Sequence, residues 1–84
     1  MKNRTGVKAG DCPTNWYSGI VKEASGGGFY GEIEGKQDHQ IHYFNMGYTE
    51  FIPQGKGVTV GETVSYAPYV PPNPRAGKVG CIKS

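Results

Sequence analysis

The sequence predicts a single all-β domain, built as a small barrel of five strands. The chain has 84 residues, which leaves room for one small core and no second one. Its 14 glycines and 6 prolines divide it into short apolar runs, as is typical of strands joined by turns. No stretch repeats apolar residues at the i, i+3, i+4, i+7 spacing of an amphipathic helix. Several short strands without a helix are the pattern of a small barrel.

The expected elements follow one another closely along the chain. Residues 1–15 are polar and basic, and we expect a flexible arm there, with the barrel spanning residues 16–84. Apolar and β-branched residues predict a first strand at 16–24, and a loop of glycines at 25–28 separates it from a hairpin that ends at residue 44. Further strands are expected at 58–66, with a turn at Gly61, and at 75–82. Residues 45–57 and the proline-rich stretch 67–74 should be loops.

The hairpin within residues 26–44 is the most informative stretch. Period-two alternation places Tyr30, Glu32 and Glu34 on one face. A turn at residues 35–37 would then set three pairs across the hairpin: Glu34 with Asp38, Glu32 with Gln40, and Tyr30 with His42. An aromatic residue opposite a histidine on an open face can stack on unpaired bases, and it can equally belong to an ordinary sheet.

The charges are distributed unevenly. The formal net charge is +2, and all seven acidic residues lie between Asp11 and Glu62. The two ends are purely basic, through Lys2, Arg4, Lys8, Arg75, Lys78 and Lys83. Basic ends suit a polyanionic partner, and ordinary solvated lysines are the alternative reading.

The two cysteines, Cys12 and Cys81, lie near opposite ends of the chain. They have no CxxC spacing, and the two histidines are remote from them in sequence, so no metal site is expected. We expect two reduced thiols in a cytoplasmic protein. The alternative is a Cys12–Cys81 disulfide, because the first and last strands of a barrel can be neighbours.

Membrane association, catalysis and cofactors are not expected. No apolar run follows the basic N-terminal residues as in a signal peptide, and none approaches the length of a membrane span. The sequence also lacks a Ser/His/Asp or Cys/His order and a phosphate-binding loop before a helix. The expected protein is therefore a binding protein and not an enzyme.

Five segments resemble, in order, the motifs of the bacterial cold-shock domain, a five-stranded oligonucleotide-binding (OB) barrel. Residues 19–22 (GIVK) resemble the opening Gly-x-Val-Lys, and residues 28–33 (GFYGEI) and 38–43 (DHQIHY) the two ribonucleoprotein motifs. Residues 61–66 (GETVSY) and 73–79 (NPRAGKV) resemble the two later motifs of the family. Together the segments cover nearly all of the chain after the arm.

The resemblance implies a protein that binds single-stranded RNA or DNA, similar to a nucleic-acid chaperone. Carried over residue by residue, three rings remain for stacking on bases, and the expected binding residues are Lys22, Tyr30, His42, Tyr43, Arg75 and Lys78.

Three positions depart from the family pattern. Glu23 replaces a tryptophan, and Glu32 and Gln40 replace phenylalanines. Since each stacked base contributes about 1–3 kcal/mol, these losses imply weak to moderate binding. The same three residues define the alternative, a protein-interaction module on a degenerate cold-shock scaffold that binds or inhibits a protein of the nucleic-acid machinery.

Overall fold

The computed structural model describes residues 12–13 and 15–84, and the described part contains strands and turns but no helix. None of its segments is therefore a helix long and apolar enough to cross a membrane. Its strands are β1 (Tyr17–Ser25), β2 (Tyr30–Gly35), β3 (Ile41–Asn45), β4 (Glu50–Ile52), β5 (Thr63–Pro68) and β6 (Val79–Lys83). The all-β class is confirmed.

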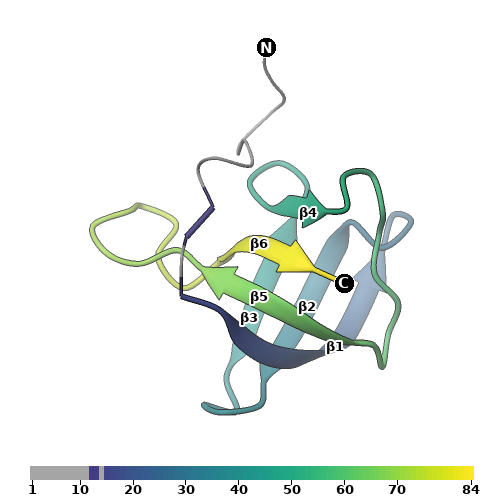
Figure 1. Ribbon diagram of the computed structural model, residues 1–84, viewed down its shortest axis with the longest axis horizontal. Helices are drawn as coiled ribbons and strands as arrows, with labels where there is room; N and C mark the ends of the chain where they lie inside the picture. Colours follow the sequence, from purple (N-terminus) through teal and green to yellow (C-terminus); the bar gives the residue numbers. More distant parts are fainter. Residues whose placement is uncertain (1–11, 14) are drawn as a thin grey trace.

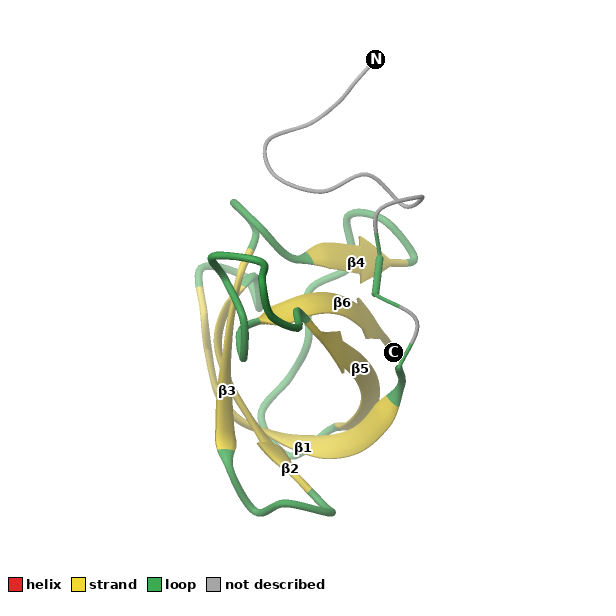
Figure 2. Cartoon of the chain, turned by 90° about the vertical axis from the view of Figure 1, so that its left-hand side faces the viewer, coloured by secondary structure: helices red, strands yellow, loops and turns green. Residues whose placement is uncertain are grey.

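The six strands form one sheet in the order β3-β2-β1-β5-β6-β4 (Figure 1). The sheet curls around a single core, so that residues of β3 approach β6 (Figure 2). The hydrogen-bonded order of the described strands nevertheless begins at β3 and ends at β4, and does not close. The described sheet thus has six strands, and the expected five-stranded barrel is not confirmed.

Alternation builds the core in β1, β2 and β5, since every second side chain of a strand points to the same face, whereas β6 is buried at four consecutive positions. The buried apolar residues of the core are Val21, Ile33, Phe44, Phe51, Val58, Val64, Tyr66, Val79 and Ile82, of which Val58 lies in the loop before β5. Gly19 lets two of these meet, because a Cβ there would lie 2.9 Å from the Tyr66 ring and closer still to Ile33.

Strand β4 lies within a segment that was expected to be a loop. It pairs with β6 in parallel, with Phe51 beside Ile82. Thr49, directly before β4, fixes the beginning of this strand against β6, because its buried hydroxyl donates a hydrogen bond to the Val79 carbonyl at 2.7 Å. A parallel partner about 30 residues further along the chain leaves no local sequence pattern, which is why the strand was missed.

Two expected strands are shorter than predicted. Residues 58–62 make turns, and β5 begins only at Thr63. Residues 75–78 also form a turn, in which the Lys78 amide donates to the Arg75 carbonyl at 2.9 Å and Gly77 has a φ of 89°. Because only glycine adopts this φ readily, the chain bends there before β6 starts.

The expected pairing of the hairpin is wrong. In the structure Glu34 pairs with Ile41, Glu32 with Tyr43, and Tyr30 with Asn45. The reason is a longer turn, in which the Asp38 carboxylate accepts a hydrogen bond from the Gln40 amide at 3.0 Å and His39 has a left-handed φ of 58°. Such a local bond from an aspartate side chain is a typical turn device. Asp38 and Gln40 therefore belong to the turn and not to the sheet.

The two cysteines form a disulfide, so the expectation of two reduced thiols is wrong and the alternative holds. Their Cα atoms are 5.7 Å apart. Pro13 packs on β6 next to the bond, where a Cβ on Gly80 would come within 2.7 Å of the proline ring. This bond ties the chain before β1 to the last strand. The rest of the expected arm, residues 1–11 and 14, lies outside the described residues.

Candidate functional site

Two exposed tyrosines mark one face of β2 and β3, which we call the tyrosine face and define as Tyr30, Glu32, Ile41 and Tyr43. Tyr30 is 40% exposed and Tyr43 51% exposed. Because Glu32 pairs with Tyr43, and Tyr30 lies two residues before Glu32, the two rings are diagonal neighbours across the strands. Ile41, 41% exposed, extends the apolar surface along β3.

Cations approach this face from two sides. The Lys78 ammonium lies 5.6 Å from the centroid of the Tyr43 ring, a geometry in which the cation is attracted to the ring. On β1 a bulge between Val21 and Glu23 lets both Lys22 and Glu23 face solvent. The Lys22 ammonium lies 3.6 Å from a Glu34 carboxylate oxygen, so this lysine is partly neutralised.

The same face also carries acidic residues. Glu23 of β1 pairs directly with Glu32 of β2, so two carboxylates stand side by side on adjacent strands. Like charges in this position repel each other and repel phosphates. A cationic partner would relieve this repulsion.

Arg75, another expected binding residue, contacts a different ring. Its guanidinium lies 5.4 Å from the centroid of Tyr48, in the connection between β3 and β4. Burial raises the pKa of Tyr48, and the positive charge of Arg75 opposes that rise. The structure thus brings Lys22, Tyr30, Tyr43 and Lys78 to the tyrosine face and places Arg75 against Tyr48.

His42 does not share the face of Tyr30. It pairs with the buried Ile33, and its side chain is only 13% exposed. One ring nitrogen, Nδ1, lies 2.9 Å from the Gly77 carbonyl, and the other, Nε2, lies 3.0 Å from an Asp38 carboxylate oxygen. The observed register differs from the expected one by three residues, and a shift by an odd number moved this ring from the outer to the inner face.

Asp38 is thereby held as a carboxylate. Hydrogen bonds from the Gln40 backbone amide and from the His42 ring lower the pKa of Asp38 below its ordinary value. Both atoms that face the His42 ring are acceptors, so both bonds form together only when each ring nitrogen carries a proton.

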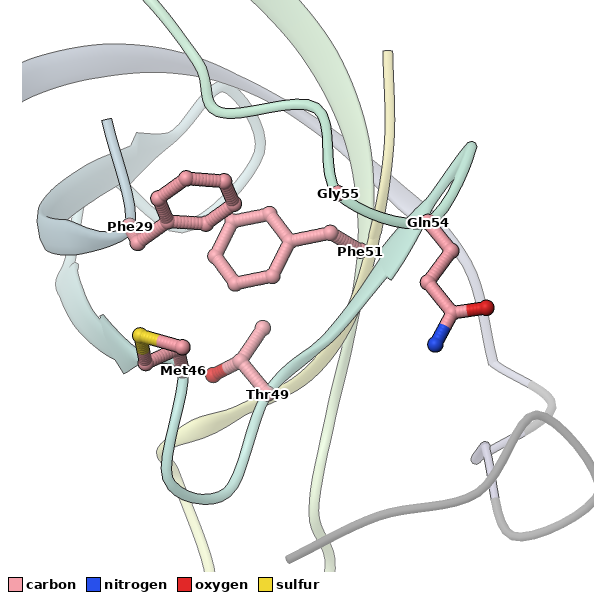
Figure 3. A pocket seen from close by; sticks show the side chains of 6 residues that line it. All are labelled: Phe29, Met46, Thr49, Phe51, Gln54 and Gly55. Carbon is pink, nitrogen blue, oxygen red and sulfur yellow. The ribbon is translucent and has the colours of Figure 1, made fainter. Parts of the chain in front are cut away.

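An apolar hollow of about 190 Å³ lies beside the end of the tyrosine face and was not expected from the sequence. Its Phe29 and Phe51 rings meet edge to face with centroids 5.0 Å apart. Figure 3 shows Met46 and Thr49 beside the two rings, and Gln54 extending away from them. The Met46 amide donates to the Phe29 carbonyl at 3.0 Å, which places the half-exposed Met46 across from Phe29, just beyond the Tyr30–Asn45 pair. Alternation in the stretch Gly-Phe-Tyr could have indicated Phe29, whereas Phe51 lies in the strand that the sequence did not show.

Within the described ranges, no three His, Cys, Asp or Glu side chains come together as a metal site. Comparison of the chain with models of protein families, with curated proteins and with solved structures found no match.

Proposed function

We propose that the protein binds single-stranded RNA or DNA across the tyrosine face, in the manner of a cold-shock domain and without catalysis. The observation that most supports this proposal is the diagonal pair of exposed rings, Tyr30 and Tyr43. The Lys78 ammonium lies 5.6 Å from the centroid of the Tyr43 ring. Successive bases can stack on such rings while a cation meets the backbone, and each stacked base contributes about 1–3 kcal/mol.

The arrangement of the strands supports a scaffold of the OB type. Strand β1 pairs on one side with β2 and on the other with β5, and residues of β3 approach β6. OB barrels are closed only in part, and they bind oligonucleotides on the face of their second and third strands. The tyrosine face lies on the second and third strands of this chain.

The expected affinity is weak and strongly dependent on salt. Only two rings of the tyrosine face remain for stacking, and the Glu23–Glu32 pair repels phosphates.

The proposed cellular role is that of a nucleic-acid chaperone. The cytoplasmic location expected from the sequence remains a proposal that the Cys12–Cys81 disulfide disfavours, because disulfides are rare in reducing compartments.

The paired carboxylates favour a second candidate function. Glu23 and Glu32 stand on adjacent strands beside two exposed rings, a surface that a basic protein segment would complement. In this case the protein contacts or inhibits a protein of the nucleic-acid machinery, and nucleic acid competes for the same face or does not bind.

The test is a titration of labelled oligothymidine and of a mixed-sequence RNA, at about 50 and about 200 mM salt. The Tyr43→Ala variant should weaken binding by about fivefold or more, since one stacking ring is lost. Trp16→Ala is the matched control, because Trp16 is also an exposed ring, with the Lys83 ammonium 4.8 Å from its centroid, and lies outside the tyrosine face.

Equal effects of the two substitutions, or no binding to either oligonucleotide at low salt, would overturn the nucleic-acid proposal. Binding of a lysine-rich peptide that is weakened by Glu32→Gln would then support the second candidate.

A further inference from the structure

The hydroxyl of Tyr66 is a buried polar group with no hydrogen-bond partner within the described part of the chain. Tyr66 is 2% exposed, and its ring packs between His42, at 5.2 Å, and Tyr17, at 6.0 Å between centroids. Among the described residues no hydrogen bond reaches its hydroxyl. Because buried tyrosine hydroxyls are nearly always hydrogen-bonded, this group indicates a binding position for something else.

The Tyr66 side chain borders a hollow of about 270 Å³. The lining residues are Tyr17, Gln37, Asp38, His42, Tyr66 and Pro68. A Cβ on Gly35 would collide with both the Tyr66 hydroxyl and the Asp38 oxygen Oδ1, so these two oxygens lie close to each other beside the glycine. No hydrogen bond joins the two oxygens in the described structure, and a donor group placed between them would bond to both.

Asp38 gives the site its negative charge, which the His42 ring offsets in part. The pKa of Asp38 is lowered, mainly by the Gln40 amide and by His42, so the carboxylate is ionised. Burial and the negative charge of Asp38 raise the pKa of Tyr66, so its hydroxyl stays neutral. The His42 ring is hydrogen-bonded to the second carboxylate oxygen of Asp38, Oδ2, and Oδ1 accepts a hydrogen bond from the Gln40 backbone amide. A carboxylate beside the ring faces of Tyr17 and Tyr66 attracts an organic cation.

We propose that this hollow, which we call the Asp38–Tyr66 pocket, binds the guanidinium group of an arginine side chain on a partner protein. A guanidinium is flat enough to lie against the Tyr17 ring, and its forked donors reach two oxygens at once, which a single ammonium does less well. This site is separate from the tyrosine face and does not depend on nucleic-acid binding.

His42 competes with such a ligand for the charge of Asp38. The titratable groups that line the pocket are Asp38, His42, Tyr17 and Tyr66. Lys36, in the same turn as Asp38, lines a different hollow, and Lys78 contacts Tyr43. A proton on His42 reduces the attraction of Asp38 for the guanidinium.

The experiment compares N-acetylarginine amide with N-acetylcitrulline amide, which has the same shape and no charge. Both are titrated into the full chain at about pH 8, where an ordinary histidine is neutral, and amide and tyrosine ring signals are followed by NMR. The expected result is saturable shifts at Tyr66 and at residues 37–42 with a dissociation constant of about 1–10 mM for the arginine compound, and at least tenfold weaker binding of the citrulline compound.

Two variants locate the binding. Asp38→Asn should abolish saturation, and Tyr66→Phe, which removes only the hydroxyl, should weaken binding at least threefold. Glu62→Gln removes a carboxylate in the turn before β5, outside both the pocket and the tyrosine face, and is the control that should bind normally. Equal binding of the two compounds, unchanged binding by Tyr66→Phe, or shifts without saturation would overturn the proposal and leave a water-filled hollow. If Asp38→Asn fails to fold, the comparison of the arginine and citrulline compounds on the unaltered chain still tests whether the pocket prefers a cation.

Discussion

His42 and Gly77 are joined by a hydrogen bond of 2.9 Å between the ring nitrogen Nδ1 and the backbone carbonyl. The bond links β3, at one end of the sheet order, to the loop that precedes β6. Through its other nitrogen the same ring is bonded to Asp38, in the turn between β2 and β3. His42 therefore connects two loops that the hydrogen-bonded ladder of the sheet does not join.

This connection predicts how stability depends on pH. The folded pKa of Asp38 is lowered, so its carboxylate stabilises the fold fully above the ordinary value of 3.8 and loses that contribution as the pH falls through the folded value. Between about pH 5 and about pH 2.5, the natural chain should lose more unfolding free energy than Asp38→Asn, measured by urea denaturation. Parallel losses in the two chains would contradict the bonds assigned to Asp38.

The observed register predicts the effect of restoring an aromatic residue to the tyrosine face. Glu32→Phe adds a ring opposite Tyr43 and removes a carboxylate. Oligonucleotide affinity should rise about fivefold, equal to about 1 kcal/mol for one added stacking ring. Gln40→Phe is the matched control and should give no gain, because Gln40 lies in the turn.

The reverse outcome, a gain from Gln40→Phe and none from Glu32→Phe, would contradict the register. Folding of both variants is checked by far-UV circular dichroism, which should show strand and turn without a helical minimum.

Two glycines with left-handed backbones predict different costs of an added methyl group. Gly28 has a φ of 91° and Gly55 a φ of 81°. A Cβ on Gly28 would collide with the Val58 backbone, whereas nothing lies within 4 Å of a Cβ on Gly55. Gly55→Ala should cost about 1–2 kcal/mol from the backbone alone, and Gly28→Ala at least about 1 kcal/mol more, because the close approach to Val58 must open.

Urea denaturation of both variants measures this difference. Equal losses of unfolding free energy in the two variants would contradict the prediction, because they would show that the backbone at Val58 moves away from residue 28 without loss of stability.

The disulfide predicts a large loss of stability on reduction. Cys12 and Cys81 are 69 residues apart, and closing a loop of that size removes enough entropy from the unfolded chain to stabilise the fold by about 4 kcal/mol. Guanidinium denaturation with and without a phosphine reductant should show this difference. Cys12→Ala should be insensitive to the reductant and as stable as the reduced natural chain. An unchanged midpoint, with two free thiols confirmed by mass spectrometry, would contradict the prediction.

The sequence by itself determined the all-β class, most of the strands and the outward direction of Tyr30 and Glu32. These features depend on period-two alternation and on glycine and proline turns, which act over a few residues. The outward direction of Tyr30 follows from the buried position of Ile33, three residues along the same strand.

The tertiary structure decided the partners across the sheet. The place of His42 depended on the length of the turn, which the bond from the Gln40 amide to Asp38 stabilises. The register is shifted by three residues from the expected one, and any odd shift reverses the face of every side chain of a strand. Strand β4 and the Cys12–Cys81 bond depended on the curl of the sheet, which brings distant segments of the chain together at β6. Such contacts form between residues that are far apart in sequence, and no local pattern of side chains records them.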